Sequence, residues 1–363
     1  MAIKINKMDQ PNNAGSSGER RDAEAAGGVR PTVRRLLPRS YLVLVLLAMI
    51  IVGFIASPDF LTARNVGNVV STSAIVAVLA VGQFFVIVTG GIDLSVGSVM
   101  ALSTVVTALL LRAGVPAGVA VLITLGGCAL VGLCNGLSVV WLRIAPFIAT
   151  LATMIAIEGL SYVIQSTNLI SIDNQAFVTV FHDGHLLGVP NPVTIFVLVT
   201  LVAAYVARFS TFGRRLYAIG GNREAARLSG LPVSRDLLIT YTLSGALAGL
   251  AGLLAAAQLL QGSSLIGQGE ELSAIAAVVV GGASLAGGRG DPISAVLGTF
   301  VITIITNIMN LVGISSQPQL MIQGVVIILA VFLSSAGGVG RISAAVRSLG
   351  RHRRSTVREG AAA

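Results

Sequence analysis

Lysine is almost absent from this chain: its 363 residues include only Lys4 and Lys7, both close to the amino terminus. A phosphate-binding P-loop needs the pattern G-x-x-x-x-G-K-[ST], so the chain does not bind ATP in that way. Lysine-based covalent catalysis in the remaining residues is excluded for the same reason. The motifs G-x-S-x-G, H-E-x-x-H and C-x-x-C are missing too, and we therefore expect no catalytic residue and no cofactor.

Cysteine and histidine are also scarce, with two and three copies. Cys128 and Cys134 both lie in the apolar run 116–140. Six residues apart on one helix they do not share a face, which favours small apolar side chains over a disulfide or a metal pair. His182 and His185 lie in a polar loop without a third ligand, so ordinary loop residues are favoured over a metal site. We expect no bound metal.

Charge is low, at 11% of residues, whereas 54% are hydrophobic and the mean hydropathy is +0.88. A soluble domain has roughly 25% charged residues. About 20 apolar residues cross a hydrocarbon core of about 30 Å, and the sequence contains about ten such segments. The predicted fold is therefore an all-α polytopic transmembrane bundle. Its predicted spans are 41–57, 68–89, 97–112, 116–140, 146–165, 191–208, 236–260, 272–288, 292–312 and 319–335.

Basic residues gather in three places: of 24 Lys and Arg, eight lie in residues 1–40, six in 208–235 and six in 341–363. The positive-inside rule assigns all three segments to the cytoplasm, which requires an even number of crossings between them. The six and four predicted spans satisfy this requirement, so both termini are expected in the cytoplasm. The predicted organisation is a disordered cytoplasmic tail (1–40), a transmembrane permease domain (41–335) with a cytoplasmic coupling segment (209–235), and a basic cytoplasmic tail near anionic lipid (336–363).

One apolar segment is echoed later in the chain: SAIVAVLAVGQFFVIVTGGIDLSVG begins at Ser73, and SAIAAVVVGGASLAGG begins at Ser273. Such an echo arises by chance in sequence rich in Ala, Val and Gly, or from two five-span halves of opposite orientation. Under the second interpretation, paired glycine-interrupted helices point to the translocation pathway, where protein or a water-filled cavity satisfies their backbone. The predicted pathway and helix-break residues are Gly90, Gly91, Asp93, Ser95, Gly97, Gly281 and Gly282.

Asp93 and Glu158 are the ionisable residues within predicted spans, where charge is costly and often functional. We interpret Asp93 as the N-cap of the third span, with direct contact to a permeant as the alternative. Glu158 is expected to bond a neighbouring helix or to face the cavity. Amide side chains both donate and accept, so a cavity lined by them suits sugars, although interhelical hydrogen bonding is the alternative for each. The predicted cavity residues are Gln83, Asn135, Asn307 and Asn310.

The cytoplasmic segment 212–236, FGRRLYAIGGNREAARLSGLPVSRD, contains the pattern of a short helix. Asn222 can cap its start, Glu224 lies in its first turn, and Gly230 followed by Pro232 ends it. A short capped helix between two long spans predicts a docking element for a cytoplasmic partner. A basic loop held at the lipid surface is the alternative.

Four motifs in order carry a family resemblance: GGIDLSVGS at 90–98, APFIATLATM at 145–154, AIGGNREAARLSGLPVSR at 218–235 and GGASLAGGRGDPISAVLGTFVI at 281–302. With them the chain resembles the permease subunits of bacterial ABC importers of the ribose/xylose/simple-sugar family, over roughly residues 40 to 335. The coupling helix of ABC permeases carries E-A-A-x-x-x-G. By this resemblance the contact with the ATPase involves Asn222, Glu224, Ala225, Ala226 and Gly230.

The resemblance implies a multi-pass protein of the bacterial cytoplasmic membrane that imports a monosaccharide, a ribose-like pentose or a hexose. It implies three protein partners: a second permease copy, expected to be identical, a cytoplasmic ATP-binding subunit and an extracytoplasmic sugar-binding protein. Membrane lipid is the remaining partner, and nucleic acid is not one. The alternatives are the same fold importing branched-chain amino acids or another small polar solute, and an ion-coupled secondary transporter. The latter needs buried carboxylates in several spans, and only two candidates are present.

Overall fold

The computed structural model describes residues 31–166, 169–315, 318–325 and 328. The chain forms two compact units, Met1–Tyr41 and Leu42–Ala363. The described part of the first unit is helical and belongs to α1 (Pro31–Ala56). Helix α1 begins at Pro31, since proline suits the first turn of a helix, and it includes the last ten residues of the predicted tail 1–40, whose bounds stay a prediction. Residues 1–30 and the predicted tail 336–363 lie outside the described residues.

Long apolar helices make up the second unit, as predicted for an all-α polytopic bundle. Within the described ranges, six helices are long and apolar enough to cross a membrane, and ten spans stay a prediction. These six are α2 (Ala63–Val88), α4 (Ala117–Val140), α5 (Pro146–Gln165), α7 (Asn191–Phe209), α10 (Val233–Leu259) and α12 (Pro292–Leu311). The shorter apolar helices are Tyr41–Ala56 and α3 (Val96–Arg112).

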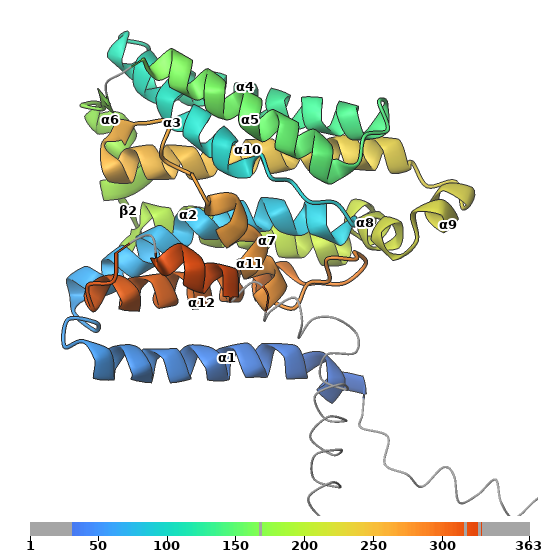
Figure 1. The fold of residues 1–363 in the computed structure, drawn as a ribbon, viewed down its shortest axis with the longest axis horizontal. Helices are drawn as coiled ribbons and strands as arrows, with labels where there is room; N and C mark the ends of the chain where they lie inside the picture. The colour runs from blue at the N-terminus through green and yellow to red at the C-terminus, as the bar shows by residue number, and fades with distance from the viewer. Residues whose placement is uncertain (1–30, 167–168, 316–317, 326–327, 329–363) are drawn as a thin grey trace, which may run out of the picture. The chain divides into compact units, whose positions relative to one another are not determined.

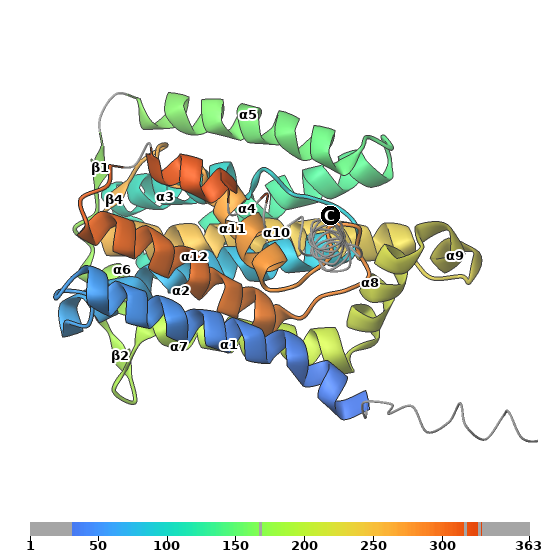
Figure 2. The same ribbon diagram turned by 60° about the horizontal axis from the view of Figure 1, so that its bottom comes forward.

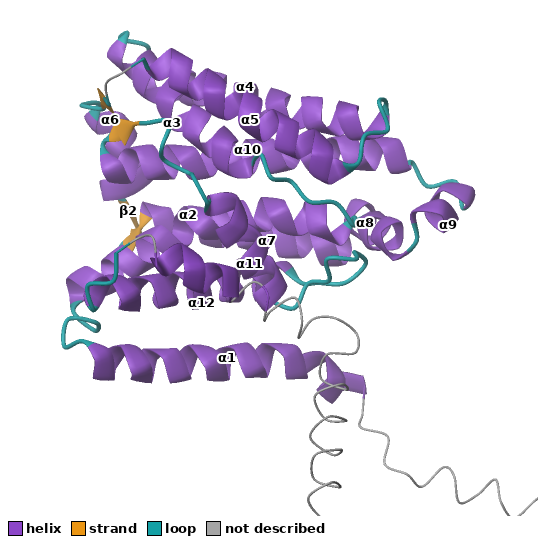
Figure 3. Cartoon of the chain, viewed as in Figure 1, coloured by secondary structure: helices purple, strands orange, loops and turns teal. Residues whose placement is uncertain are grey.

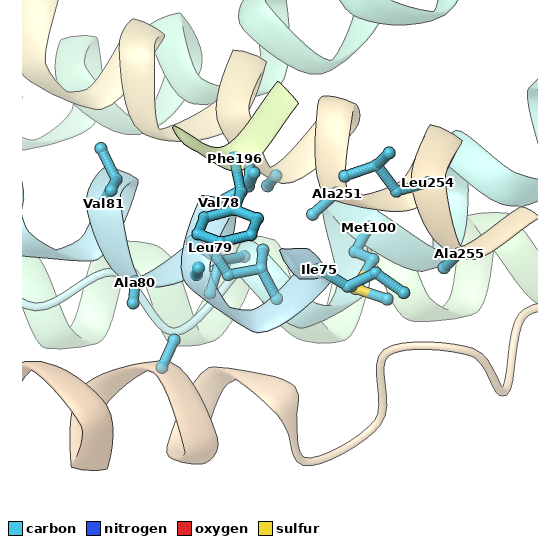
Figure 4. Packing of buried hydrophobic residues seen from close by; sticks show 14 of the residues in the cluster. Ile75, Val78, Leu79, Ala80, Val81, Met100, Phe196, Ala251, Leu254 and Ala255 are labelled. Atoms are coloured by element: carbon cyan, nitrogen blue, oxygen red, sulfur yellow. The ribbon is translucent and has the colours of Figure 1, made fainter. Parts of the chain in front are cut away.

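The core of this unit forms around two helices, α2 and α10 (Figure 1). Helix α10 packs against α2, α3 and α4, whereas α2 also contacts α7, α11 and α12. The most apolar stretch of α2 is 83% buried, compared with 17% for α5, which lies along one edge in Figure 2. Figure 4 shows this packing, with Ile75 and Val78 of α2 in the same apolar cluster as Met100 of α3 and Leu254 of α10.

The polar segment 169–190, which contains His182 and His185, has structure of its own. It contains β1 (Ile170–Ser171), α6 (Gln175–Val178), a π-helical turn (Thr179–Asp183) and the hairpin of β2 (His185–Leu186) and β3 (Val189–Pro190). Strand β1 pairs antiparallel with β4 (Gln261–Gly262), which follows α10. In Figure 3 these strands gather at one end of the long helices, opposite the short helices α8 (Thr211–Gly221) and α9 (Arg223–Leu228). The loop and the coupling segment therefore occupy opposite ends.

The span predicted at 272–288 differs most from its helix. Helix α11 (Glu270–Val280) ends eight residues earlier, because Gly282 adopts a φ of 90° and the chain turns away from the helix axis. It begins after a non-helical segment, 263–269, which lies between the predicted spans 236–260 and 272–288. Helix α11 is thus only 11 residues long and lies between two interruptions.

Candidate coupling and translocation site

Helix α9 has the ends that the sequence predicts. The Asn222 Oδ1 atom accepts a hydrogen bond from the Ala225 N–H at 2.9 Å, which caps the first turn. Glu224 lies in that first turn, where the positive end of the helix dipole favours a carboxylate. Gly230 ends the helix with a φ of 76°, a left-handed conformation that glycine adopts without strain. The predicted short capped helix is confirmed.

One side of α9 is buried and the other is charged. Ala226 is 5% exposed and packs in a cluster with Ile219, Val233 and Leu237. On the opposite side the Arg227 guanidinium donates to the Glu224 carboxylate at 2.7 and 3.2 Å, and both side chains are well exposed. These hydrogen bonds and the positive charge lower the pKa of Glu224. The exposed side of the helix therefore carries an ion pair of Glu224 and Arg227.

Helix α8 is fixed to the membrane-crossing helices by polar contacts at both sides. Arg215 donates from Nε and Nη2 to the two carboxylate oxygens of Asp236, at 2.6 and 2.9 Å, which ties α8 to α10. Asp236 is fully buried, and this pairing raises the pKa of Arg215. The Tyr217 hydroxyl donates to the Gly290 carbonyl at 3.0 Å. Burial and the Asp291 carboxylate raise the pKa of Tyr217 to about 12, so this donor keeps its proton at neutral pH.

Helix α2 ends at Val88, and α3 begins at Val96 after a non-helical stretch, 89–95, which we call the first break. Asp93 is buried at its centre. Its Oδ1 accepts from the Ser95 N–H at 3.0 Å and from the Ser95 hydroxyl at 2.7 Å, and its Oδ2 accepts from the Ser244 hydroxyl of α10 at 2.9 Å. The N-cap position of α3 is Ser95 itself, without a side-chain capping bond. The predicted N-cap role of Asp93 is therefore corrected to an Asx-type turn before the helix, anchored to α10.

Gln83 and Asn135, predicted as cavity residues, lie fully buried against the first break. The Gln83 amide donates to the Asp93 carbonyl at 3.0 Å and accepts from the Asp93 N–H at 3.3 Å, in the orientation that satisfies both groups. Asn135 of α4 donates to the Ser95 hydroxyl at 2.8 Å. Thr150 of α5 donates to the Ile92 carbonyl at 3.2 Å. Four helices thus hydrogen-bond to the first break: α2 and α5 bond its backbone, and α4 and α10 bond its side chains. Non-helical backbone in an apolar interior needs such partners.

The second break, residues 281–291, follows α11 and lies directly against the first. The Gly288 N–H donates to the Val88 carbonyl at 2.9 Å. The carboxyl ends of α2 and α11 therefore lie together, and the earlier parts of both helices line one cavity, so the two helices run in the same direction. Segments related by an inverted repeat would run in opposite directions. The similar segments 73–97 and 273–288 are therefore not equivalent parts of such a repeat.

Gly220 of α8 completes this contact. A Cβ atom at Gly220 would overlap the Val88 carbonyl oxygen and the Gly288 nitrogen. A Cβ atom at Gly287 would lie 2.8 Å from the Gly220 oxygen and 2.9 Å from the Gly90 nitrogen. Backbones from three parts of the chain meet here, among them Gly90 of the first break, which has a φ of 80°. We call this contact the glycine junction: Val88, Gly90, Gly220, Gly287 and Gly288.

The remaining predicted break residues lie elsewhere. Gly91 faces the Tyr241 hydroxyl, and Gly281 packs on the backbone of Ser294 in α12. Gly97 lies at the start of α3 and contacts the Gly267 carbonyl, while a Cβ there would also overlap the Glu271 carboxylate. The starts of α3 and α11 therefore meet, a contact that sequence reasoning missed because 263–269 gave no helical signal.

Asn307 and Asn310 line a cavity of about 350 Å³ between α2, α11, α12 and the helical residues 318–325. Asn307 and Asn65 each donate an amide hydrogen to the other's carbonyl, at 2.8 and 3.0 Å. Asn310 accepts from Gln319 at 2.6 Å. The four predicted cavity residues are thus divided, with two at the first break and two here. Other polar lining residues are Asn68, Thr72, Glu270, Ser273, Thr303, Thr306 and Gln323.

Some residues of this site carried a usable sequence signal and others did not. The pair Gly220–Gly221, directly before the cap of α9, and the acidic pair Glu270–Glu271 in apolar surroundings both stand out in the sequence. Ser244, Thr150 and Thr303 do not, because hydroxyl residues are common in membrane helices and mostly bond the preceding turn. Within the described ranges, no three His, Cys, Asp or Glu residues gather in a way that could hold a metal ion.

Apolar crossing helices, two interrupted helices and a short exposed helix joined to both interruptions define a class of protein: the membrane subunit of a transport system. The chain belongs to the family described as branched-chain amino acid transport system / permease component, whose model matches residues 65–331. It is a transport subunit and a multi-pass membrane protein. The family implies an ATP-binding subunit and a substrate-binding protein as partners.

Relatives with given substrates support this assignment. The chain is 40% identical to the ribose import permease protein RbsC of Bacillus subtilis over 289 residues, 79% of this chain and 90% of the relative. It is 38% identical to the D-allose transport system permease protein AlsC of Escherichia coli K12, covering 78% of this chain and 87% of the relative. It is 34% identical to the xylose transport system permease protein XylH of the same organism, covering 76% and 86%. No solved structure matches the chain.

Proposed function

We propose that the chain is the membrane subunit of an ATP-driven importer that carries a monosaccharide, a pentose or a hexose, across the cytoplasmic membrane. The observation that carries the ATP-driven mechanism is the glycine junction, because it connects the exposed helix α9, through α8, to both breaks. The sugar is inferred from the relatives, whose names give ribose, allose and xylose as substrates. These are neutral polyhydroxylated molecules of similar size.

The family description leaves branched-chain amino acids as a second candidate substrate. An amino acid carries a carboxylate that a transport site must neutralise with a cation or a helix amino terminus. The cavity beside Asn307 is lined by amides, hydroxyls and the carboxylate of Glu270, without any Lys or Arg among its described lining residues. Because Glu270 already places a carboxylate in the first turn of α11, the lining favours a neutral polyol over an amino acid.

We place both termini and α9 on the cytoplasmic side, with residues 41–335 as the permease domain, 209–235 as its coupling segment and the two tails outside it. The basic clusters support this orientation. The ATP-binding subunit would then contact α9, with Glu224 and Arg227 exposed towards it and Asn222, Ala225, Ala226 and Gly230 maintaining its shape. The substrate-binding protein would approach the opposite end, where the short strands lie.

Force applied to α9 would reach the breaks through rigid elements. The paired Arg215 and Asp236 oblige α8 and α10 to move together, and Tyr217 attaches α8 to the second break at Gly290. Because Gly220 contacts both breaks, a displacement of α8 would move the ends of α2 and α11. Closure of the ATPase would in this way shift the helices that surround the pathway between two arrangements.

We propose a second, identical copy on the side of α5. Glu158 on this helix accepts from Gln268 at 3.0 Å, and the bond lies at an exposed position of the single chain. Ionisable groups within spans face protein or a water-filled cavity rather than lipid, so this side is expected to meet another copy. Ile155, which is 62% exposed on the same helix, offers a position for a cysteine cross-link.

We also propose an inverted repeat of five spans, but its two halves align differently from the similar segments 73–97 and 273–288. Helices α3 and α11 both follow a long helix, α2 and α10 respectively, and both begin after a non-helical stretch. Their starts meet at Gly97 and Gly267. This correspondence pairs α2 with α10 and α3 with α11, as expected of two halves of opposite orientation.

Reconstitution in proteoliposomes tests the proposed function, with the ATPase and a sugar-binding protein added or omitted. We expect uptake of ribose, allose or xylose that requires ATP and both added proteins. Glu224→Gln and Gly230→Val should insert normally and yet hydrolyse ATP without uptake. Uptake driven by an ion gradient without the ATPase would contradict the proposal, and so would full coupling in both variants.

A further inference from the structure

The cavity of about 350 Å³ has walls from α2 and from the much later helices α11 and α12, with Gln323 of the helical residues 318–325 beside them. Helix α2 contributes Asn68 and Thr72, α11 contributes Glu270, and α12 contributes Thr303 and Thr306. Helices α2 and α12 pack against each other and against α11 along this region, as Figure 1 shows. The cavity therefore has a polar lining inside an otherwise apolar bundle.

Two of the lining groups have no hydrogen-bond partner among the described residues. The hydroxyl oxygen of Thr303 and the Oε2 atom of Glu270 are both buried and unpaired, and Thr303 is only 7% exposed. A buried polar group without a partner costs about 1–3 kcal/mol, so such groups are normally completed by water or by a ligand. By contrast, Asn65 and Asn307 satisfy each other beside the cavity.

The volume lies within the range of small-molecule sites. Sugar hydroxyls both donate and accept, which matches a lining of one carboxylate, several hydroxyls and several amides. We propose that this cavity is the transit site of the sugar, in which a sugar hydroxyl donates to Glu270 Oε2 and others pair with the hydroxyls of Thr303 and Thr306. This assignment rests on the proposed function, since it takes a monosaccharide to be the cargo.

The position of the cavity fits transport. The amino-terminal parts of α2 and α11 form its walls, and the carboxyl end of α2 meets the second break, which follows α11, in the glycine junction. Any movement of α8 that displaces the junction is transmitted along both helices to the cavity. Coupling and substrate binding would thus act on opposite ends of one pair of parallel helices.

Protection from chemical labelling tests the assignment in the complete reconstituted importer. Thr306→Cys is introduced together with Cys134→Ser, which removes the exposed native thiol, whereas Cys128 is buried. We expect the transported sugar to slow labelling of this cysteine by a small thiol reagent about fivefold at saturation. A cysteine replacing Val312, which is 48% exposed just beyond α12 and does not line the cavity, should label at the same rate with and without sugar.

Further substitutions, added to the variant with Thr306→Cys and Cys134→Ser, measure how much the two unpaired groups contribute to sugar binding. Thr303→Val and Glu270→Met, which keep the size of the side chain without its polar atoms, should each raise the sugar concentration for half protection about fivefold, as expected for one lost hydrogen bond. Thr299→Val is the matched control, because Thr299 lies one turn earlier on α12 and bonds the Ala295 carbonyl outside the cavity. Sugar uptake without protection of the cysteine would overturn the transit site alone. Absence of ATP-dependent sugar uptake by the unaltered importer would overturn the proposed function instead.

Discussion

The backbone N–H of Gly288 donates a hydrogen bond to the carbonyl oxygen of Val88 at 2.9 Å, which joins the end of α2 to the second break. The two residues belong to different parts of the chain, and Gly220 of α8 lies beside the bond. No side chain fits between these backbones. The close approach explains why glycine is needed in three separate segments at this point.

Substitution of alanine in the last turn of α8 should distinguish this junction from ordinary helix packing. Gly220→Ala places a Cβ atom against the Val88 carbonyl oxygen, and overpacking of this kind costs about 1–3 kcal/mol. Gly221→Ala is the matched control, since a Cβ there has open space, and alanine favours a helix over glycine by about 0.5–1 kcal/mol. In detergent, the unfolding temperature should fall for Gly220→Ala and rise for Gly221→Ala.

The variants Gly220→Ala and Gly221→Ala should also differ in how well ATP hydrolysis is coupled to sugar uptake. We expect Gly220→Ala to hydrolyse ATP with little sugar uptake, and Gly221→Ala to behave as the unaltered importer. Equal uptake per ATP in the two variants would show that the junction does not transmit movement from α8.

The short helix α9 could be predicted from the sequence because its signals are local. Asn222, Glu224 and Gly230 act on backbone groups within a few residues, so propensity and capping rules apply directly. The apolar crossing helices were predictable for a similar reason, since hydropathy over about 20 residues reports on one segment alone. The extent of α11 could be predicted only in part: Gly281 and Gly282 indicated a break, but hydropathy extended the span to 288 because two glycines barely change the mean hydropathy of an apolar run.

The positions of the polar side chains required the fold. Gln83 and Asn307 look alike in the sequence, as single amides in apolar helices, yet one braces the first break and the other borders the cavity. The difference depends on which helix packs alongside, and those partners are far away in the chain. The partner of Asp93 on α10, Ser244, shows the same limit, because nothing near Asp93 in the sequence identifies it.

Replacement of Asp93 should distinguish its hydrogen bonds from its charge. Asn keeps an oxygen for the Ser95 N–H and offers an amide hydrogen to the Ser244 hydroxyl, so Asp93→Asn should retain most uptake. Leucine leaves both partners unpaired in the interior, at about 1–3 kcal/mol each. Asp93→Leu should therefore unfold at a clearly lower temperature in detergent. Equal damage from Asn and Leu would mean that the charge itself is required.

A second stability prediction concerns the ion pair between Arg215 and Asp236. Arg215→Ala would leave the fully buried Asp236 without its guanidinium, and breaking a buried pair costs about 3–5 kcal/mol. Since Arg215 is 26% exposed and partly screened by solvent, we expect about 2–3 kcal/mol. Thermal unfolding of the detergent-solubilised chain measures the change. Arg214→Ala is the control, because that side chain makes one exposed bond to the Phe209 carbonyl and its loss should change stability little.

The ion pair on α9 predicts how coupling responds to pH. The hydrogen bonds from Arg227 lower the pKa of Glu224 below the ordinary value of about 4.3. A carboxyl group with a lowered pKa contributes stability that is present above its unfolded pKa and is lost as the pH falls through the folded value. The pair is thus fully ionised at every pH from about 5 to about 8, and Glu224 should give coupling no pH dependence in this window.

Sugar-stimulated ATP hydrolysis in proteoliposomes, measured across that window, checks this expectation. Glu224→Gln should lower the stimulation by the same factor at each pH, because it removes a charge that is present throughout. Arg227→Gln should produce a similar loss, since the remaining carboxylate is exposed and loses its orientation rather than its charge. A transition near neutral pH that disappears in Glu224→Gln would contradict the assigned ionisation and require a different contact between α9 and the ATPase.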